Sequence, residues 1–301
     1  MSRRVGAVLA GGVVALALLL PAGASADHNG LNPPWPELLP SLPGPTDVQP
    51  QPVPHCRTPS IACVDQLVRR LEKRWRVLDR SCDHRAVPTL AYLRINQELR
   101  AELAKRESLF RHKPWFYSLL TTFSNRYFTA VKRYKQGKPV TESWQIAFDA
   151  WESGEITAGQ EILLFSNAHV QHDLPEAYAE MGQRTRRGVS RKHDHDVFNE
   201  INNRILDPVG DEIAERYDPT FPLVDLKPLP ADEIGSQEFV KVWRELAWRN
   251  GELLLAAQTP AERRQVEEMI DHEAAGWARL IVSFEVPGLR ETRDAHCMAH
   301  G

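Results

Sequence analysis

The sequence predicts an all-α protein, with one multi-helix, bundle-like domain preceded by a signal peptide and a proline-rich linker. Three observations support this. Apolar residues recur at every third or fourth position through most of the chain after residue 54. Runs that alternate apolar and polar residues never exceed a few positions, so strands are not expected. The 301 residues are 42% hydrophobic and 26% charged, without internal repeats, which is typical of a globular chain with a sizeable core.

Residues 1–26 have the order of a secretory signal peptide. Two arginines open the segment, an apolar run extends from about residue 6 to residue 20, and Ala24-Ser25-Ala26 closes it. The run is shorter than the ~20 residues that a membrane-spanning helix needs. We expect cleavage before Asp27 and a protein that is secreted or associated with the cell envelope. The opening Ser2-Arg3-Arg4 leaves a twin-arginine signal as an alternative.

Residues 27–54 are expected to form a linker. Nine of these 28 residues are proline, and apolar periodicity is almost absent. Proline fixes φ and removes a backbone donor, which favours an extended, polyproline-II-like tether. Trp35, Leu38, Leu39 and Leu42 leave open whether this segment docks on the domain, which we assign to residues 55–301.

Periodic apolar residues predict four helices in the first half of this domain. Ser60 is placed to cap the first, the second follows Pro88, and Gly137 ends the third. The expected helices span about residues 61–78, 90–103, 115–134 and 141–151.

Five further helices are expected in the second half. Pro208 should disturb one of them, and residues 218–230, with four prolines, should form a long loop. Thr259-Pro260-Ala261-Glu262 combines an N-cap, a first-turn proline and a capping-box acid. These helices run from Thr157 towards Asp173, from Pro175 for a short stretch, and over about residues 193–217, 238–258 and 260–285.

The charge balance argues against nucleic acid as a partner. The net charge is −3, and removal of residues 1–26 leaves 35 basic and 40 acidic residues, a net charge of −5. Binding to a phosphate backbone needs a basic surplus. The mean hydropathy of −0.41 excludes a polytopic membrane protein, and no transmembrane segment is expected after signal cleavage.

A local basic stretch has two interpretations. It could steer an anionic small molecule or an envelope component towards a site, or it could simply be solvated. Its members within nine positions are Arg184, Arg186, Arg187, Arg191 and Lys192.

The four cysteines favour disulfides over metal ligation, because their number is even and the chain is expected to be exported. Three pairings are possible, and free buried thiols are a further alternative. We favour Cys56–Cys63 and Cys82–Cys297. Loop-closure entropy gives roughly 5 kcal/mol for the long bridge and roughly 2–3 kcal/mol for the short one.

The first candidate site is His169, His172 and Asp173. On a helix these side chains lie within an arc of about 100°, and two imidazoles with a carboxylate are ligands that a divalent metal can use. The apolar residues 162–165 just before them indicate that they approach the core. The alternative is a buried hydrogen-bonded network in which Asp173 pairs with an arginine such as Arg126.

The second candidate is the string His193-Asp194-His195-Asp196. His195, Asn199 and Asn202 fall within about 60° of one another on a helix, next to an apolar stripe. This pattern is typical either of a polar site or of a solvated helix start.

Asp83-His84, directly after Cys82, is the third candidate, with a helix cap and a surface histidine as the alternative. Phosphate-binding, dinucleotide-binding, nucleophile-elbow and His-Glu-x-x-His motifs are absent from the sequence.

Several strings in the chain resemble a bacterial, mainly actinobacterial, secreted family that carries a domain of unknown function, whose most distinctive motif is Asn-Ala-His-x-x-His-Asp-Leu. The match runs from about Cys82 to Asn202. The strings are Cys82-Asp83-His84-Arg85-Ala86 with Ala91-Tyr92-Leu93-Arg94, Phe123-Ser124-Asn125-Arg126-Tyr127-Phe128, and Asn167-Ala168-His169 with His172-Asp173-Leu174-Pro175. The resemblance implies a helical domain without an agreed activity. The residues that it implies act together are Asp83, His84, Asn125, Arg126, Asn167, His169, His172 and Asp173.

Three functional hypotheses follow. The leading one is an exported metal-dependent hydrolase. His169, His172 and Asp173 would hold a divalent ion, and His84 or His195, with Asp196 in support, would add a ligand or act as general base. The alternative is a non-catalytic secreted binding or structural domain with a buried His/Asp/Arg network. The third is a redox-metal protein in a helical bundle.

Overall fold

The computed structural model describes residues 42, 44–46, 48, 56–221, 236–284 and 288–300, all within one compact unit that spans residues 32–301. The expected signal peptide and most of the expected linker therefore lie outside the described residues. The prediction of an all-α domain is confirmed, because the described ranges contain helices and no strand. An isolated antiparallel bridge joins Arg184 and Ser190.

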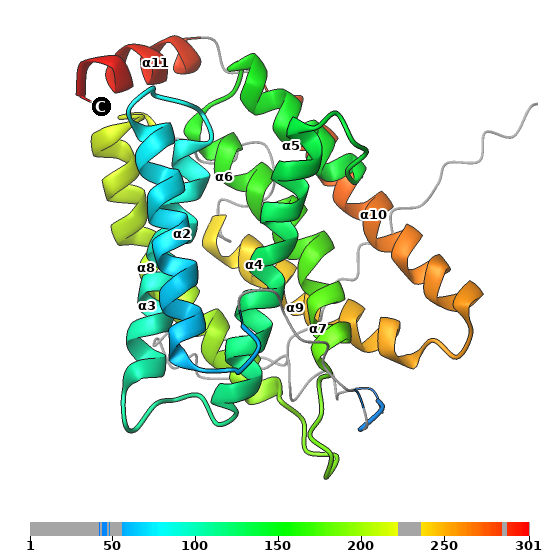
Figure 1. The fold of residues 1–301 in the computed structure, drawn as a ribbon. Coiled ribbons are helices and arrows are strands. Elements are labelled where there is room, and N and C mark those ends of the chain that lie inside the picture. Colours follow the sequence, from blue (N-terminus) through cyan, green and yellow to red (C-terminus); the bar gives the residue numbers. More distant parts are fainter. Residues whose placement is uncertain are drawn as a thin grey trace, which may run out of the picture. The chain divides into compact units, whose positions relative to one another are not determined.

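The helices follow the predicted order (Figure 1). They are α2 (Ile61–Asp79), α3 (Ala86–Ala104), α4 (Lys113–Lys135), α5 (Glu142–Ser153), α6 (Ala158–Ser166), the π-helix η1 (Asn167–Asp173), α7 (Leu174–Met181), α8 (Lys192–Arg216), α9 (Ser236–Ala256), α10 (Pro260–Val282) and α11 (Leu289–His300).

The helices pack around η1. Helix α2 packs on α3 and α3 on α8, while α7 packs on α9 and α5 on α10 (Figure 1). The π-helix contacts α4, α5, α6, α7, α9 and α10, so its side chains lie in the middle of the bundle. The main apolar core follows the same elements and is rich in aromatic residues. Any polar side chain on the inner face of η1 therefore needs partners from several helices.

Residues 158–181 form one continuous helix with a π-turn at its centre. A capping box between Thr157 and Gln160 begins it, as Thr157 was expected to do. The backbone N–H of Leu174 donates to the carbonyl of His169, five residues earlier. A proline inside a helix clashes with the carbonyl four residues before it, and the wider π-turn directly before Pro175 relieves that clash.

The start of α3 and the presence of α11 differ from the prediction. Helix α3 begins at Ala86 rather than after Pro88, because a proline in the first turn lacks only an N–H that has no partner there. Helix α11 was not expected at all. Its buried members include Arg293 and Cys297, so its sequence carries no apolar stripe that periodicity can detect.

Two disulfides close the structure, Cys56–Cys63 and Cys82–Cys297, the pairing that the sequence favoured. Cys82 has φ +49°, in the left-handed region, and the N–H of Asp83 donates to the carbonyl of Leu78 across the end of α2. Glycine usually occupies this position. Here cysteine takes it, because its sulfur must reach α11.

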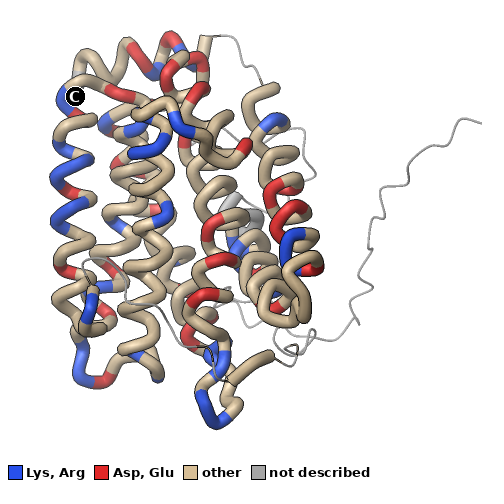
Figure 2. Tube along the Cα trace, turned by 45° about the vertical axis from the view of Figure 1, so that its right-hand side comes forward, with Lys and Arg blue, Asp and Glu red and all other residues tan. Residues whose placement is uncertain are grey.

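Acidic and basic residues are interspersed along the helices (Figure 2). Among the described residues, no helix combines the length and apolar character needed to cross a membrane.

Candidate functional site

His169 is the centre of the first polar cluster. Its ring is buried and lies parallel to that of Phe123, with centroids 3.7 Å apart. Its Nδ1 lies 2.9 Å from Oδ2 of Asp173, and its Nε2 lies 3.1 Å from the hydroxyl of Tyr92. Both ring nitrogens are thus occupied by protein groups from η1 and α3.

Asp173 is bound by three side chains at once. Its Oδ2 accepts from the indole N–H of Trp144 at 3.1 Å as well as from His169, and its Oδ1 lies 3.1 Å from Nδ1 of His172. The carboxylate therefore joins α5 to the two histidines of η1.

A chain of hydrogen bonds continues from this carboxylate through the core. An ionised Asp173 accepts from Nδ1–H of His169, so Nε2 of that ring accepts from the hydroxyl of Tyr92. The oxygen of Tyr92 lies 2.5 Å from the hydroxyl of Ser124. Four buried side chains on three elements are linked in series, which fixes their mutual orientation.

Burial and hydrogen bonding set the charge states here. Burial lowers the pKa of His169, which favours the neutral ring. Burial alone would raise the pKa of Asp173, but its hydrogen bonds from His169 and His172 outweigh this and hold the pKa at about 2. Burial alone would lower the pKa of His172, but the hydrogen bond to Asp173 and the negative charges of Asp173, Asp271 and Glu176 together raise it.

These shifts predict that acid destabilises the domain, most clearly below pH 3.8. His169, whose pKa is lowered by burial, favours unfolding below pH 6.5, whereas the raised pKa of His172 acts in the opposite direction. Asp173 contributes stability above pH 3.8 that is lost as the pH falls towards 2. Asp173→Asn should therefore lose less stability than the wild type over this acid range, while Glu245, whose pKa is also lowered, keeps its contribution in both. Thermal unfolding from pH 7 to pH 2 measures this, and an acid loss equal to that of the wild type would contradict the assignment.

The three residues do not form a convergent set of metal ligands in the described part of the chain. His172 is partly exposed and its Nε2 lies 3.9 Å from Oδ1 of Asp271, while Nδ1 faces Asp173. Asn167 joins η1 to α10 instead, donating to the carbonyl of Ala274 at 2.7 Å.

Arg126 does not neutralise Asp173, which corrects the sequence-based alternative. Its guanidinium donates to Glu180 at 3.0 Å, and this bond joins α4 to α7 near the surface. Histidine and tryptophan donors already surround Asp173, so no arginine is required there. Asn125, next to Arg126, is half-buried and takes no part in the hydrogen bonds around Asp173.

Asp83 and His84 do not contact the cluster around His169, contrary to the expectation that they join it. Asp83 is bound by Arg85, whose Nε lies 2.7 Å from Oδ1. His84 Nδ1 lies 2.5 Å from Oε1 of Glu161, which is fully buried and also 3.3 Å from Nε of Arg293. Burial raises the pKa of Glu161. Glu161 thus joins His84 to α11, because the same carboxylate oxygen contacts Arg293.

His195 is the centre of the second polar cluster. It is fully buried, which rules out the solvated helix start. The hydroxyl of Tyr178 lies 2.6 Å from its Nδ1, and Asn199 and Glu245 lie 3.0 and 3.3 Å from its Nε2. His195, Asp196 and Glu245 each offer one ligand atom, and these three atoms lie within 4.8 Å of one another, close enough together to hold a metal ion.

The ammonium group of Lys192 lies among these carboxylates. It is 2.5 Å from Oδ1 of Asp196 and 2.9 Å from Oε2 of Glu245, and the side chain is nearly fully buried. Burial would raise the pKa of Glu245, but bonds from His195 and Lys192 lower it to about 2. The ammonium group of Lys192 therefore already balances the negative charge of Asp196 and Glu245.

His193 and Asp194, the first two residues of the string, contact residues 109–112 rather than the second cluster. Asp194 accepts from the backbone N–H groups of Arg111 and His112, at 2.8 Å each, and His193 contacts the carbonyl of Leu109. Asn202 bonds to the carbonyl of Phe198 within its own helix.

Most of the basic stretch serves the fold. Arg191 donates to the carbonyls of Met181 and Gly182, and its guanidinium lies over the ring of Trp115. Arg184 donates to the carbonyl of Gly188. The part of this stretch that could attract an anion is therefore small.

Sequence reasoning missed several partners in these clusters. Trp144 and Glu245 lie on helices far along the chain from their histidines, and neither stands in a recognisable motif. Tyr92 stands within one of the strings that carried the resemblance, which was the only signal pointing to it.

The family model for a family of unknown function, DUF5995, matches residues 64–284. The chain belongs to DUF5995. The DUF5995 region contains both histidine clusters and ends before α11, so Cys82 lies inside it and Cys297 outside. No curated protein and no solved structure matches the chain significantly.

Proposed function

We propose that this DUF5995 protein is an exported, non-catalytic binding or structural domain whose two histidine clusters are buried hydrogen-bond networks. The observation that carries the proposal is the saturation of the site by protein groups. Both nitrogens of His169 and both oxygens of Asp173 have protein partners. At the second cluster, the ammonium of Lys192 holds the position between the carboxylates where a metal would bind.

Such networks have a clear physical role. A buried donor or acceptor without a partner costs about 1–3 kcal/mol, so an arrangement of helices that pairs these groups is favoured over one that leaves them unpaired. Export is supported by the signal-peptide pattern of residues 1–26 and by the two disulfides.

The decisive measurement combines metal content with stability. We expect the purified wild type to carry no stoichiometric divalent metal, and His169→Ala to lose about 3 kcal/mol because it empties a buried site and leaves Tyr92 and Asp173 short of a partner. His172→Ala should lose less, because that side chain is partly exposed. Elemental analysis and urea unfolding test this.

A metal-dependent hydrolase is the second candidate, favoured by the convergence of His195, Asp196 and Glu245. The ion would lower the pKa of a bound water and supply hydroxide. Lys192 would have to leave the carboxylates. A stoichiometric divalent ion in the wild type that disappears in His195→Ala would establish this candidate and overturn the non-catalytic one.

A further inference from the structure

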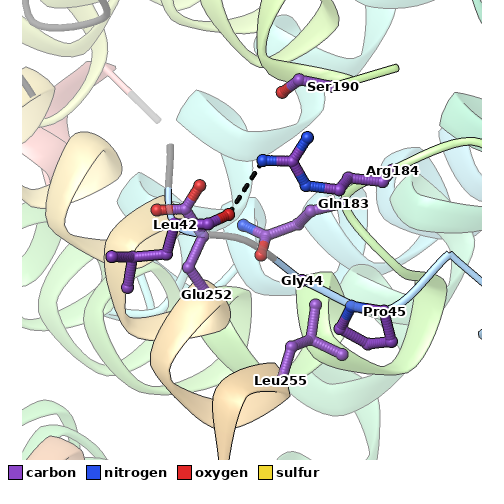
Figure 3. A pocket seen from close by; sticks show the side chains of 8 residues that line it. All are labelled: Leu42, Gly44, Pro45, Gln183, Arg184, Ser190, Glu252 and Leu255. Atoms are coloured by element: carbon purple, nitrogen blue, oxygen red, sulfur yellow. Dashed lines mark hydrogen bonds between the residues drawn. The ribbon is translucent and has the colours of Figure 1, made fainter. Parts of the chain in front are cut away.

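A pocket lies between the loop that follows α7 and the last turns of α9 (Figure 3). The domain lines it with Gln183, Arg184, Ser190, Glu252 and Leu255. Three residues of the proline-rich segment, Leu42, Gly44 and Pro45, form its remaining wall. The described residues 42, 44–46 and 48, which we call the arm, therefore lie on the domain.

The arm contacts the loop that follows α7 through the carbonyl of Leu42 and the side chain of Val48. Arg184 donates from Nη2 to the carbonyl of Leu42 at 2.8 Å, the bond drawn in Figure 3. Farther along, Val48 lies against Gly182, so closely that a Cβ on this glycine would come within 2.9 Å of the Val48 Cβ. Gly182 also has φ +71°, so both its conformation and the space beside it require glycine.

These contacts depend little on the side chains of the arm. Arg184 binds a main-chain carbonyl, and Gly182, without a side chain, leaves room for Val48 at close range. Proline fixes φ and so favours an extended, polyproline-II-like form, and it carries no N–H that would be left unpaired on the domain.

One polar group in the pocket has no hydrogen-bond partner within the described residues. Gln183 is 3% exposed, and its Nε2 donates to the carbonyl of Trp248 at 2.7 Å, which fixes the amide. Its Oε1 is buried and accepts no hydrogen bond. Pro45, which lines the same pocket, has no N–H to offer. A ligand with a donor at this point would give this oxygen the partner that it lacks.

We propose that this groove binds an extended, proline-containing peptide segment of a partner protein, and that the arm is its intramolecular ligand until the partner displaces it. The proposal rests on the proposed binding function and names its partner class. The partner segment should place an N–H opposite Oε1 of Gln183.

The test uses the mature chain and a labelled peptide with the sequence of residues 40–50. Val48→Asp should loosen the arm without touching the groove, and the exposed Val77→Asp is the matched control. The wild-type arm competes at a millimolar effective concentration, so Val48→Asp should bind the peptide at least roughly tenfold more tightly than the wild type or the control. Unchanged thermal unfolding establishes that Val48→Asp is folded.

A second substitution locates the binding. Adding Arg184→Ala to Val48→Asp should abolish peptide binding, whereas Arg187→Ala, an exposed neighbour in the same loop, should leave it unchanged. Equal affinity in the wild type and Val48→Asp, or indifference to Arg184→Ala, would overturn the proposal. If peptide binding fails in this way and the protein contains no metal, only the peptide proposal is overturned and the non-catalytic assignment stands. If the protein contains a bound divalent metal, the non-catalytic assignment is overturned regardless of the peptide result.

Discussion

Asp173→Asn should destabilise the domain by about 3–5 kcal/mol. The carboxylate accepts from His169 and Trp144 at Oδ2 and from His172 at Oδ1. An asparagine oxygen in the Oδ2 position keeps the first two bonds but directs its N–H₂ group at His172, and the reverse orientation leaves His169 and Trp144 without an acceptor. Either orientation sets a donor against at least one donor, and the negative charge that strengthens all three bonds is lost.

The measurement is urea or thermal unfolding at pH 7. For a domain of this size the loss corresponds to a fall in Tm of about 10 °C. Asp211→Asn, the same change at an exposed position of α8, should alter stability by less than about 0.5 kcal/mol. If the two variants unfold together, Asp173 does not hold the helices as argued.

The second large effect concerns the disulfide between Cys82 and Cys297. The sulfurs link residues 215 positions apart, so the bridge restricts almost the whole unfolded domain. Loop-closure entropy gives about 5 kcal/mol for this bridge, and replacing both cysteines by alanine should remove most of it. Urea unfolding under non-reducing conditions measures the loss.

The other disulfide provides the control. Cys56 and Cys63 are seven positions apart, and their double alanine variant should lose about 2–3 kcal/mol. Equal losses in the two double variants would show that loop length does not govern the stabilisation. A selective loss of α11 in the long-bridge variant would show that Arg293 alone cannot retain this helix.

Local sequence was sufficient for most helices because their signals are local. The capping boxes at Thr157 and Thr259 lie where two predicted helices begin, and the glycine at Gly154 ends α5 with φ +66°. Helix α11 lacked such a signal, since its place depends on one disulfide and one buried arginine.

The sequence by itself determined the all-α class, the order of the helices up to α10 and the approach of His169 to the core, because apolar spacing of three and four residues fixes which face of a helix is buried. Only the tertiary structure decided what those histidines meet. Asp173 takes its third donor from Trp144 on α5, and His195 and Lys192 take Glu245 from α9. A buried charge pairs with whatever the packing of distant helices brings within hydrogen-bond distance, and no local pattern records that neighbour.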